Sequence, residues 1–372
     1  MMAKTGINRW LGGIVATAAA LFLSACANQV LVEPSFLHSS KSDETQPYLT
    51  REPHLVWSAK LPAEPSAPFA LFGNVLAVPA KNRSVWFLDK GTGKKLGVYD
   101  ISGVPAGVVF DGRENLIIAE KSGNGEVLSY SLVDGGINWR FALNEAGEVP
   151  ILKRGETDPA GTVLVASRGG WVYALRADNG KPSWNQQLAP LSCTPVAVDT
   201  LFWLADFEGK LNAVANGEVV QSHKLSSPIL ALEAAGNKLF AGRGDSTFSC
   251  FSGNEGNLLW KVKTDGKVRS LAVGDSLVFF ASAIGTVAAC RVSRGEKLWE
   301  RKLEALANSP LLAAGGVVVV GTAEGRFLAL SQSTGEILWE RRIPGGPVGQ
   351  PALEGNTLFL ATTGKRVLAF RF

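Results

Sequence analysis

Histidine and cysteine are scarce in this sequence. The chain has 372 residues, of which three are His and four are Cys. Two of the His fall in a segment that we expect to be a linker, so His223 is the one histidine of the expected folded region. This scarcity argues against a histidine-rich metal site and against a Ser-His-Asp catalytic centre. We expect no catalytic, cofactor-binding or metal-ligating residues.

The cysteines of the expected folded region do not suggest a disulfide framework. Beyond residue 30 there are three cysteines, Cys193, Cys250 and Cys290, and no two are adjacent in sequence. An odd number of cysteines cannot all be paired within the chain. Cys250 and Cys290 stand at small-residue or core positions, where a buried thiol behaves as a small hydrophobe. We therefore predict that all three are structural.

Neither sign of charge predominates strongly in this chain. There are 37 Lys and Arg against 33 Asp and Glu, a net charge of +4, and charged residues make up 19% of the chain. No dense run of Lys and Arg occurs, so a nucleic-acid partner is not expected. The 46% of hydrophobic residues excludes a disordered chain. The length allows two domains or one large all-β domain.

The first residues have the features of a bacterial export signal. Lys4 and Arg9 precede an apolar stretch at 11–22, which is too short to span a bilayer about 30 Å thick. Small residues then lead into Cys26, a pattern that resembles the lipobox of bacterial lipoproteins. The resemblance implies that residues 1–25 are a signal peptide and that Cys26 becomes the lipidated first residue, acylated with chains such as palmitate. The alternative is an ordinary cleaved signal with an incidental Cys.

Residues 26–54 are interpreted as the lipidated Cys and a flexible tether. They are rich in Ser, Thr, Pro and charge, and they show no sustained period of two or of 3.6 residues. One apolar patch interrupts them, formed by Val30, Val32, Phe36 and Leu37. This patch could dock on a partner, although unimportant tether residues are the simpler explanation.

A repeated unit occupies the rest of the chain. The segments 125–139, 170–184, 246–260, 285–299 and 325–339 all end in a Trp, four residues after a turn Gly. Two degenerate copies have Gly97 and Gln221 in the Trp position, and an N-terminal half-copy supplies Trp57. The seven intervals between positions 57 and 339 give a period of about 40 residues. Such regular spacing argues against an unrepeated β-sandwich.

Each repeat contains four short β-rich runs separated by Gly-rich turns, the pattern of a propeller blade. A C-terminal half-copy at 364–370 lacks its last strand, and the run at 55–61 is a last strand without its blade. Pairing the two completes an eighth blade and removes a free sheet edge. We therefore predict an all-β, eight-bladed β-propeller of four-stranded antiparallel blades over residues 55–372, whose last blade is closed by the N-terminal strand.

The segments 174–184 and 87–94 resemble the tryptophan-docking motif of quinoprotein-like (PQQ-repeat) propellers. The resemblance implies that each Trp wedges between two blades, over a small residue and a turn Gly, with its N–H donated to a carbonyl. Phe87 is the one large residue at the small position, and it stands in the repeat that has Gly97 instead of Trp. The predicted structural docking residues are Trp57, Trp139, Trp184, Trp260, Trp299 and Trp339.

The combination of a lipobox, a short tether and one eight-bladed ring resembles the BamB family. This resemblance implies a non-enzymatic lipoprotein of the outer membrane that faces the periplasm, binds the POTRA domains of BamA and assists the insertion of β-barrel proteins. Ala27, which follows the predicted lipidation site, resembles the residue that is typical of outer-membrane sorting in proteobacterial lipoproteins. By position, Leu188 and Leu191 are the candidate partner-binding residues, although the Arg and the acidic residues of the family's contact are missing here. Ordinary blade packing explains these Leu equally well.

Two other functions are open. One is a surface-anchored propeller that binds polysaccharide or another envelope partner. The other is a dehydrogenase dependent on pyrroloquinoline quinone. Enzymes of that kind contain a similar repeat, but they use an adjacent Cys pair and converging Ca²⁺ ligands. This chain has no adjacent Cys pair, and its acids Asp206, Glu208 and Asp245 are scattered over predicted turns.

Overall fold

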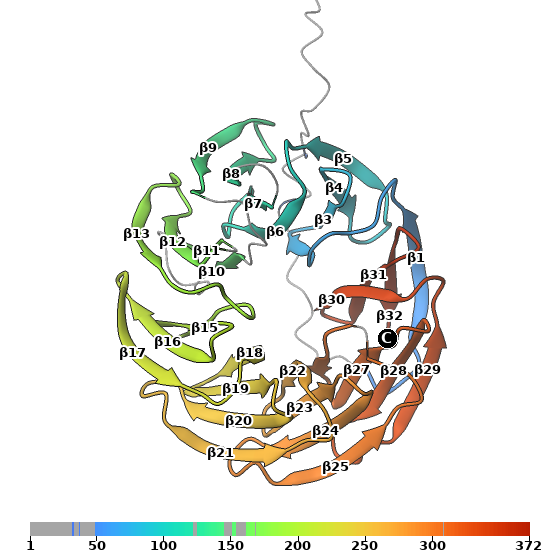
Figure 1. The fold of residues 1–372 in the computed structure, drawn as a ribbon. Coiled ribbons are helices and arrows are strands. Elements are labelled where there is room, and N and C mark those ends of the chain that lie inside the picture. The colour runs from blue at the N-terminus through green and yellow to red at the C-terminus, as the bar shows by residue number, and fades with distance from the viewer. Residues whose placement is uncertain are drawn as a thin grey trace, which may run out of the picture.

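The computed structural model describes residues 32, 37, 49–121, 125–144, 151–153, 161–167, 169–307 and 309–372, with the backbone alone for 151–153. This part of the chain forms thirty-two strands in eight antiparallel sheets of four, arranged as a ring (Figure 1). The predicted all-β, eight-bladed propeller is confirmed.

The first four blades each use four consecutive strands, in order from the centre of the ring outward. Their bounds are, for blade 1, β2 (Ala70–Phe72), β3 (Val75–Ala80), β4 (Ser84–Asp89) and β5 (Lys95–Asp100); for blade 2, β6 (Pro105–Phe110), β7 (Asn115–Glu120), β8 (Glu126–Ser131) and β9 (Ile137–Ala142); for blade 3, β10 (Ile151–Lys153), β11 (Thr162–Ala166), β12 (Trp171–Arg176) and β13 (Pro182–Gln187); and for blade 4, β14 (Val196–Val198), β15 (Leu201–Ala205), β16 (Lys210–Ala215) and β17 (Glu218–Lys224).

The next three blades follow the same order, and the eighth combines both ends of the chain. Their bounds are, for blade 5, β18 (Ile229–Ala235), β19 (Lys238–Arg243), β20 (Thr247–Ser252) and β21 (Leu258–Lys263); for blade 6, β22 (Val268–Val273), β23 (Leu277–Ser282), β24 (Thr286–Arg291) and β25 (Lys297–Lys302); for blade 7, β26 (Leu312–Ala314), β27 (Val317–Gly321), β28 (Arg326–Ser331) and β29 (Ile337–Arg342); and for blade 8, β30 (Pro347–Glu354), β31 (Thr357–Thr362), β32 (Arg366–Arg371) and β1 (His54–Lys60).

The alternating strand directions give the ring two faces. The turn between the third and the outer strand of each blade, which we call the docking turn, lies on one of them, the docking-turn face. The turn between the second and third strands and the connection to the next blade lie on the other, the connector face. A strand of six residues is about 20 Å long, so this distance separates the two faces.

The ring closes through the two ends of the chain. β1 pairs antiparallel with β32, and Trp57 lies opposite Ala369. β1 begins at His54, so this histidine belongs to the last blade and not to the predicted tether. Pairing of β1 covers the edge of β32, which would otherwise be free to pair with another chain.

Part of the predicted tether is packed against the ring. Leu49 is fully buried among residues of blades 7 and 8, and Val32 and Leu37 are buried among residues of blades 1 and 2. A flexible tether therefore does not describe these three residues. The apolar patch predicted within it supplies two of them, which contact the chain's own propeller.

The core consists of eight slices, one at each junction between neighbouring blades. Successive side chains along a strand point to opposite faces of the sheet, so each blade contributes side chains to the slice on either side of it. Cys250 and Cys290 are buried together in the slice between blades 5 and 6, and Cys193 packs against the slice between blades 4 and 5. All three thiols are free.

The docking tryptophans lie at the outer edge of these slices. All of them except Trp339 cover the Gly of the next blade's docking turn, so closely that a Cβ built on Gly180 would be 2.3 Å from the Trp139 ring. Since Gly180 also has a φ of +68°, its lack of a side chain is required twice. The indole N–H groups donate to docking-turn carbonyls: Trp57 to Lys90 (2.9 Å), Trp139 to Ala177 (2.9 Å), Trp260 to Val292 (3.1 Å) and Trp299 to Gln332 (2.7 Å).

Trp184 and Trp339 dock differently because the turns that they meet are irregular. Trp184 covers Gly217 in the docking turn of blade 4, which is two residues shorter, and its N–H has no carbonyl partner among the described residues. Blade 8 has no docking turn, because its third and outer strands come from opposite ends of the chain. Trp339 donates instead to the carbonyl of Leu49, at 2.8 Å.

At the junction of blades 4 and 5 the indole comes from another strand. Gln221 lies opposite Ala213, as the docking Trp lies opposite the small residue in other blades. Its side chain supplies no ring, and its amide N–H donates a hydrogen bond to the Asn254 carbonyl. Trp203, on β15, and His223, on β17, together fill the space over Gly256, and Trp203 donates its N–H to the Gly253 carbonyl at 2.8 Å. Gln221 therefore has the register expected of the docking position, while the rings that fill this junction come from other positions.

The volume exchange expected in blade 1 is present. Phe87 lies opposite Gly97 and is fully buried. Its ring is stacked on Tyr130 of blade 2, which also meets Tyr99 at a centroid distance of 4.1 Å. These three rings, together with Phe72 and Phe110, occupy the slice that has no docking Trp.

Candidate interaction surface

The two candidate partner-binding residues lie on the connector face. Leu188 and Leu191 belong to the connection between β13 and β14, and both are half-buried against the slice between blades 3 and 4. Their position is fixed by backbone bonds from Leu188 N–H to the Gly170 carbonyl and by a bridge between Leu191 and Asp206. Most of their surface serves blade packing, and only part of it is available to a partner.

Phe207 is an exposed apolar residue of this region that the repeat pattern did not predict. It lies at the tip of the turn between β15 and β16, and its side chain is 61% exposed. Its N–H donates to the Pro190 carbonyl, so the ring stands beside the connection that carries Leu191. The turn is held by Asp206, whose buried carboxylate accepts the N–H of Lys210 at 2.8 Å. An aromatic residue in an otherwise polar Gly-containing turn was the signal that could have revealed it.

Charged side chains in the turn of Phe207 and in the neighbouring blade 5 are held in pairs. Glu208 and Lys210 are 3.0 Å apart, and the hydrogen bond from Lys210 lowers the pKa of the Glu208 carboxyl. In blade 5 the nearly buried Arg243 guanidinium pairs with Asp245 at 3.0 Å, and Ser226 joins the two. Burial acts to raise the pKa of Asp245, but hydrogen bonds from Thr247 and Ser226 outweigh it and lower the pKa. Both acids are therefore ionised at neutral pH.

A second apolar area lies further round the same face. Ile284, in the turn between β23 and β24, is 44% exposed, and Leu306, in the connection from blade 6 to blade 7, is 53% exposed. The two segments are adjacent, since the N–H of Leu303 donates to the Gly285 carbonyl. The connector face of blades 4 to 7 thus carries two exposed apolar areas with fixed ion pairs between them.

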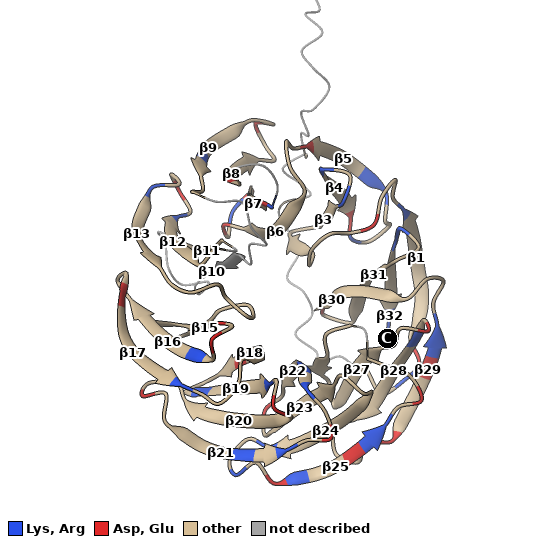
Figure 2. Ribbon diagram, viewed as in Figure 1, with Lys and Arg blue, Asp and Glu red and all other residues tan. Residues whose placement is uncertain are grey.

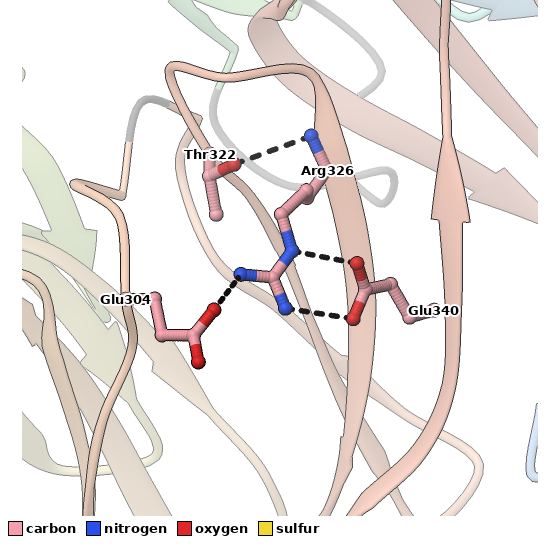
Figure 3. Close-up of polar contacts among 4 residues, drawn as sticks. All are labelled: Glu304, Thr322, Arg326 and Glu340. Atoms are coloured by element: carbon pink, nitrogen blue, oxygen red, sulfur yellow. Dashed lines mark hydrogen bonds and ion pairs between the residues drawn. The ribbon is translucent and has the colours of Figure 1, made fainter.

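Arg326, the first residue of β28, lies on the connector face of blade 7. Its guanidinium binds both carboxylate oxygens of Glu340, at 2.6 and 2.8 Å, and also reaches Glu304 at 3.0 Å (Figure 3). The fork of Arg326 holds the pKa of Glu340 below its usual range, and Glu340 raises that of Arg326. Glu304 remains almost fully exposed, so the arrangement presents one free carboxylate edge to solvent. Figure 2 shows further charged residues along the outer strands β25 and β29.

Two titratable groups with raised pKa values, Glu233 and Cys193, lie near each other at blades 4 and 5. Glu233, on the inner strand β18, is partly buried, and burial raises its pKa to about 7. Burial also raises the pKa of the nearby Cys193 thiol to about 12, which leaves it protonated and unreactive. In the described ranges no three His, Cys, Asp or Glu side chains form a group that could hold a metal ion.

The predicted lipidation site, Cys26, lies outside the described residues. No helix in the part of the chain that the structure describes has both the length and the apolar character needed to cross a membrane.

An eight-bladed ring with docking tryptophans is the architecture of the PQQ-repeat propellers. The family model described as outer membrane protein assembly factor BamB matches residues 123–372. The chain therefore belongs to the BamB family. The outer membrane protein assembly factor BamB of Burkholderia pseudomallei is 25% identical to it over 320 residues, which are 85% of this chain and 76% of that protein.

Other similarities concern shorter segments or the fold alone. The serine/threonine-protein kinase AfsK of Streptomyces coelicolor is 30% identical over 143 residues, 38% of this chain and only 16% of the kinase. Among solved structures, BamB from Moraxella catarrhalis aligns with a TM-score of 0.73 at 18% identity, over 86% of this chain and 100% of that one. Sqt1 from Saccharomyces cerevisiae aligns with a TM-score of 0.75 at 13% identity, over 87% of this chain and 100% of that one.

Proposed function

We propose that this chain is a non-catalytic, lipid-anchored scaffold on the periplasmic side of the outer membrane, which assists the assembly and insertion of β-barrel proteins by binding the POTRA domains of a BamA-like protein. Membership of the BamB family supports the role in outer membrane protein assembly. The observation that carries the binding site is the exposed ring of Phe207 beside the connection that holds Leu188 and Leu191.

The chemistry of this surface suits a protein partner. An exposed aromatic ring beside a connection that carries partly exposed aliphatic side chains can enter an apolar pocket, and such anchors supply most of the binding energy of protein interfaces. The paired charges of Glu208, Lys210, Arg243 and Asp245 form a polar border. Charged borders of this kind direct encounter and register more than they add affinity.

Phe207→Asp is expected to weaken binding to the POTRA domains of the BamA-like protein from the same organism by about 30-fold, since a central aromatic anchor contributes at least about 2 kcal/mol. The dissociation constant would be measured by calorimetry with purified proteins. Val133→Asp is the matched control, because Val133 is an exposed apolar residue on the docking-turn face. Equal weakening by both variants, or none by Phe207→Asp, would contradict the proposed site.

Cys26→Ser is expected to release the protein from the membrane into the soluble periplasmic fraction. Two or more acyl chains give stable anchoring because each buried CH₂ contributes about 0.8 kcal/mol, and serine cannot carry the thioether-linked diacylglycerol. The check is fractionation of cell envelopes followed by immunoblotting. A variant protein that stayed in the membrane fraction after a salt wash would show that Cys26 is not the anchor.

A further inference from the structure

The junction between blades 1 and 2 has a hydrogen-bond acceptor but no docking indole. In five other junctions, an indole N–H binds the carbonyl three residues before the docking-turn Gly: those of Lys90, Ala177, Gly253, Val292 and Gln332. The corresponding carbonyl in blade 2 is that of Leu132, three residues before Gly135. Gly97 stands where blade 1 would supply the Trp.

A residue near the N-terminus takes the place of the missing indole. The backbone N–H of Val32 donates to the Leu132 carbonyl at 2.8 Å. Val32 and Leu37 are buried with Phe87, Tyr99 and other residues of this slice. The N-terminal segment therefore acts as the donor where blade 1 lacks a Trp.

The N-terminal segment also supplies the hydrogen-bond acceptor that is missing at the closure of the ring. The Trp339 indole has an N–H to donate, but blade 8 has no docking turn whose carbonyl could accept it. The Leu49 carbonyl accepts this hydrogen bond instead. Phe372 lies against the Trp339 ring at a centroid distance of 5.9 Å, and Glu52 pairs with Arg341 at 3.0 Å. Both attachment points lie on the docking-turn face, one at blade 2 and one between blades 7 and 8.

We infer that this attachment holds the docking turn of blade 2 close to the lipid surface, so that the docking-turn face is turned toward the membrane near blades 1 and 2 and the connector face is turned away from it. The inference rests on the lipidation of Cys26 in the proposed function. Val32 follows Cys26 by six residues, which span at most about 21 Å. A tether that was free up to residue 54 would reach about 95 Å and would impose no orientation.

The surface near the attachment fits this placement. Val133, at the tip of the blade 2 docking turn, is an exposed apolar residue, and so are Leu55 and Val56 at the start of β1. The candidate partner residue Phe207 lies on the other face. An anchored ring would thus present Phe207 toward the periplasm, where a soluble domain can reach it.

The test is quenching of a fluorophore by nitroxide-labelled lipid in vesicles of phosphatidylethanolamine and phosphatidylglycerol that carry the full-length acylated protein. The fluorophore is attached to Val133→Cys or to Ser293→Cys, which occupy the same position, two residues before the docking-turn Gly, in blades 2 and 6 on opposite sides of the ring. A third site is Glu208→Cys on the connector face. The natural cysteines label slowly, since Cys250 and Cys290 are buried and burial raises the pKa of Cys193 to about 12.

We expect quenching at position 133 to be at least about threefold stronger than at 293 or 208, because dipolar and contact quenching by lipid nitroxides falls steeply with distance. Position 208 lies on the other face, about 20 Å away, and position 293 lies on the opposite side of the ring from the attachment. A second variant inserts twenty Gly and Ser residues between Asn28 and Gln29, which adds a mean reach of about 25 Å without touching the ring. This insertion is expected to remove the difference between the three sites.

The outcomes separate the anchor from the orientation. Protein that floats with the vesicles but is quenched equally at all three sites would overturn the orientation and leave the anchor intact. The orientation would also be overturned if the difference survived the insertion, since the short attachment would then not be its cause. Protein that did not float at all would overturn the anchor of the proposed function, and the orientation with it.

Discussion

Trp203→Ala is expected to lower the free energy of unfolding of the propeller by about 3–5 kcal/mol, the usual cost of truncating a fully buried Trp. Trp203 has no exposed surface and covers Gly256 together with His223, whose ring lies at a centroid distance of 6.2 Å. Its removal leaves a cavity between blades 4 and 5 and deprives the Gly253 carbonyl of its donor. Denaturant unfolding followed by circular dichroism would measure the change.

Gln221→Ala is the matched control, because Gln221 occupies the docking position by register. Its amide makes one bond at the exposed edge of the ring, so the expected loss is less than about 1 kcal/mol. The double change Trp203→Leu with Gln221→Trp restores the arrangement of blade 3, where Leu164 and Trp184 flank Ala174. It should recover part of the stability lost in Trp203→Ala. Equal losses for Trp203→Ala and Gln221→Ala would contradict the assigned role of Trp203.

Deletion of residues 27–61 is expected to abolish cooperative folding. The change removes β1, and with it the partner of β32, the docking Trp57 and the Leu49 carbonyl that receives Trp339. Because the net stability of a domain is only about 5–15 kcal/mol, the loss of a whole strand and two docking contacts at the closure exceeds what the ring can tolerate. The exposed edge of β32 is expected to cause aggregation.

The matched control for this deletion removes residues 27–48 and keeps Leu49 and β1. It is expected to give a soluble β-rich protein that unfolds cooperatively, with a lower midpoint because Val32 and Leu37 are lost. Soluble yield, circular dichroism and thermal unfolding would compare the two. A soluble protein with a sharp transition after deletion of 27–61 would show that seven complete blades close without the terminal strand.

Local spacing was enough to predict the ring. The interval of about 40 residues, the Gly four residues before each Trp and the half-copies at the two ends all depend on short-range turn chemistry, which a sequence displays directly. Even the exchange between Phe87 and Gly97 was visible, because the two residues are cross-strand neighbours at fixed positions of the repeat. The repeat thus determined the number of blades, the strand order and the way in which the last blade is closed.

The exceptions to the repeat were not predictable in the same way. The space over Gly256 can be filled from any strand that borders it, and Trp203 reaches it from β15, eighteen residues before the expected position. The exposure of Phe207 depends on the neighbouring connection, which binds its backbone and leaves its ring outside. Both depend on how neighbouring segments are placed in space, which the spacing of the repeat does not describe.

By itself, the sequence determined an eight-bladed propeller, its closure by the first strand, and most of the positions where indoles lock one blade to the next, because each follows from the regular recurrence of one unit. Only the tertiary structure decided which side chains fill the two irregular junctions and that Val32, Leu37 and Leu49 belong to the ring. These contacts join segments up to 290 residues apart and have no period, so they form only where the closed ring leaves a donor, an acceptor or an apolar space without a partner.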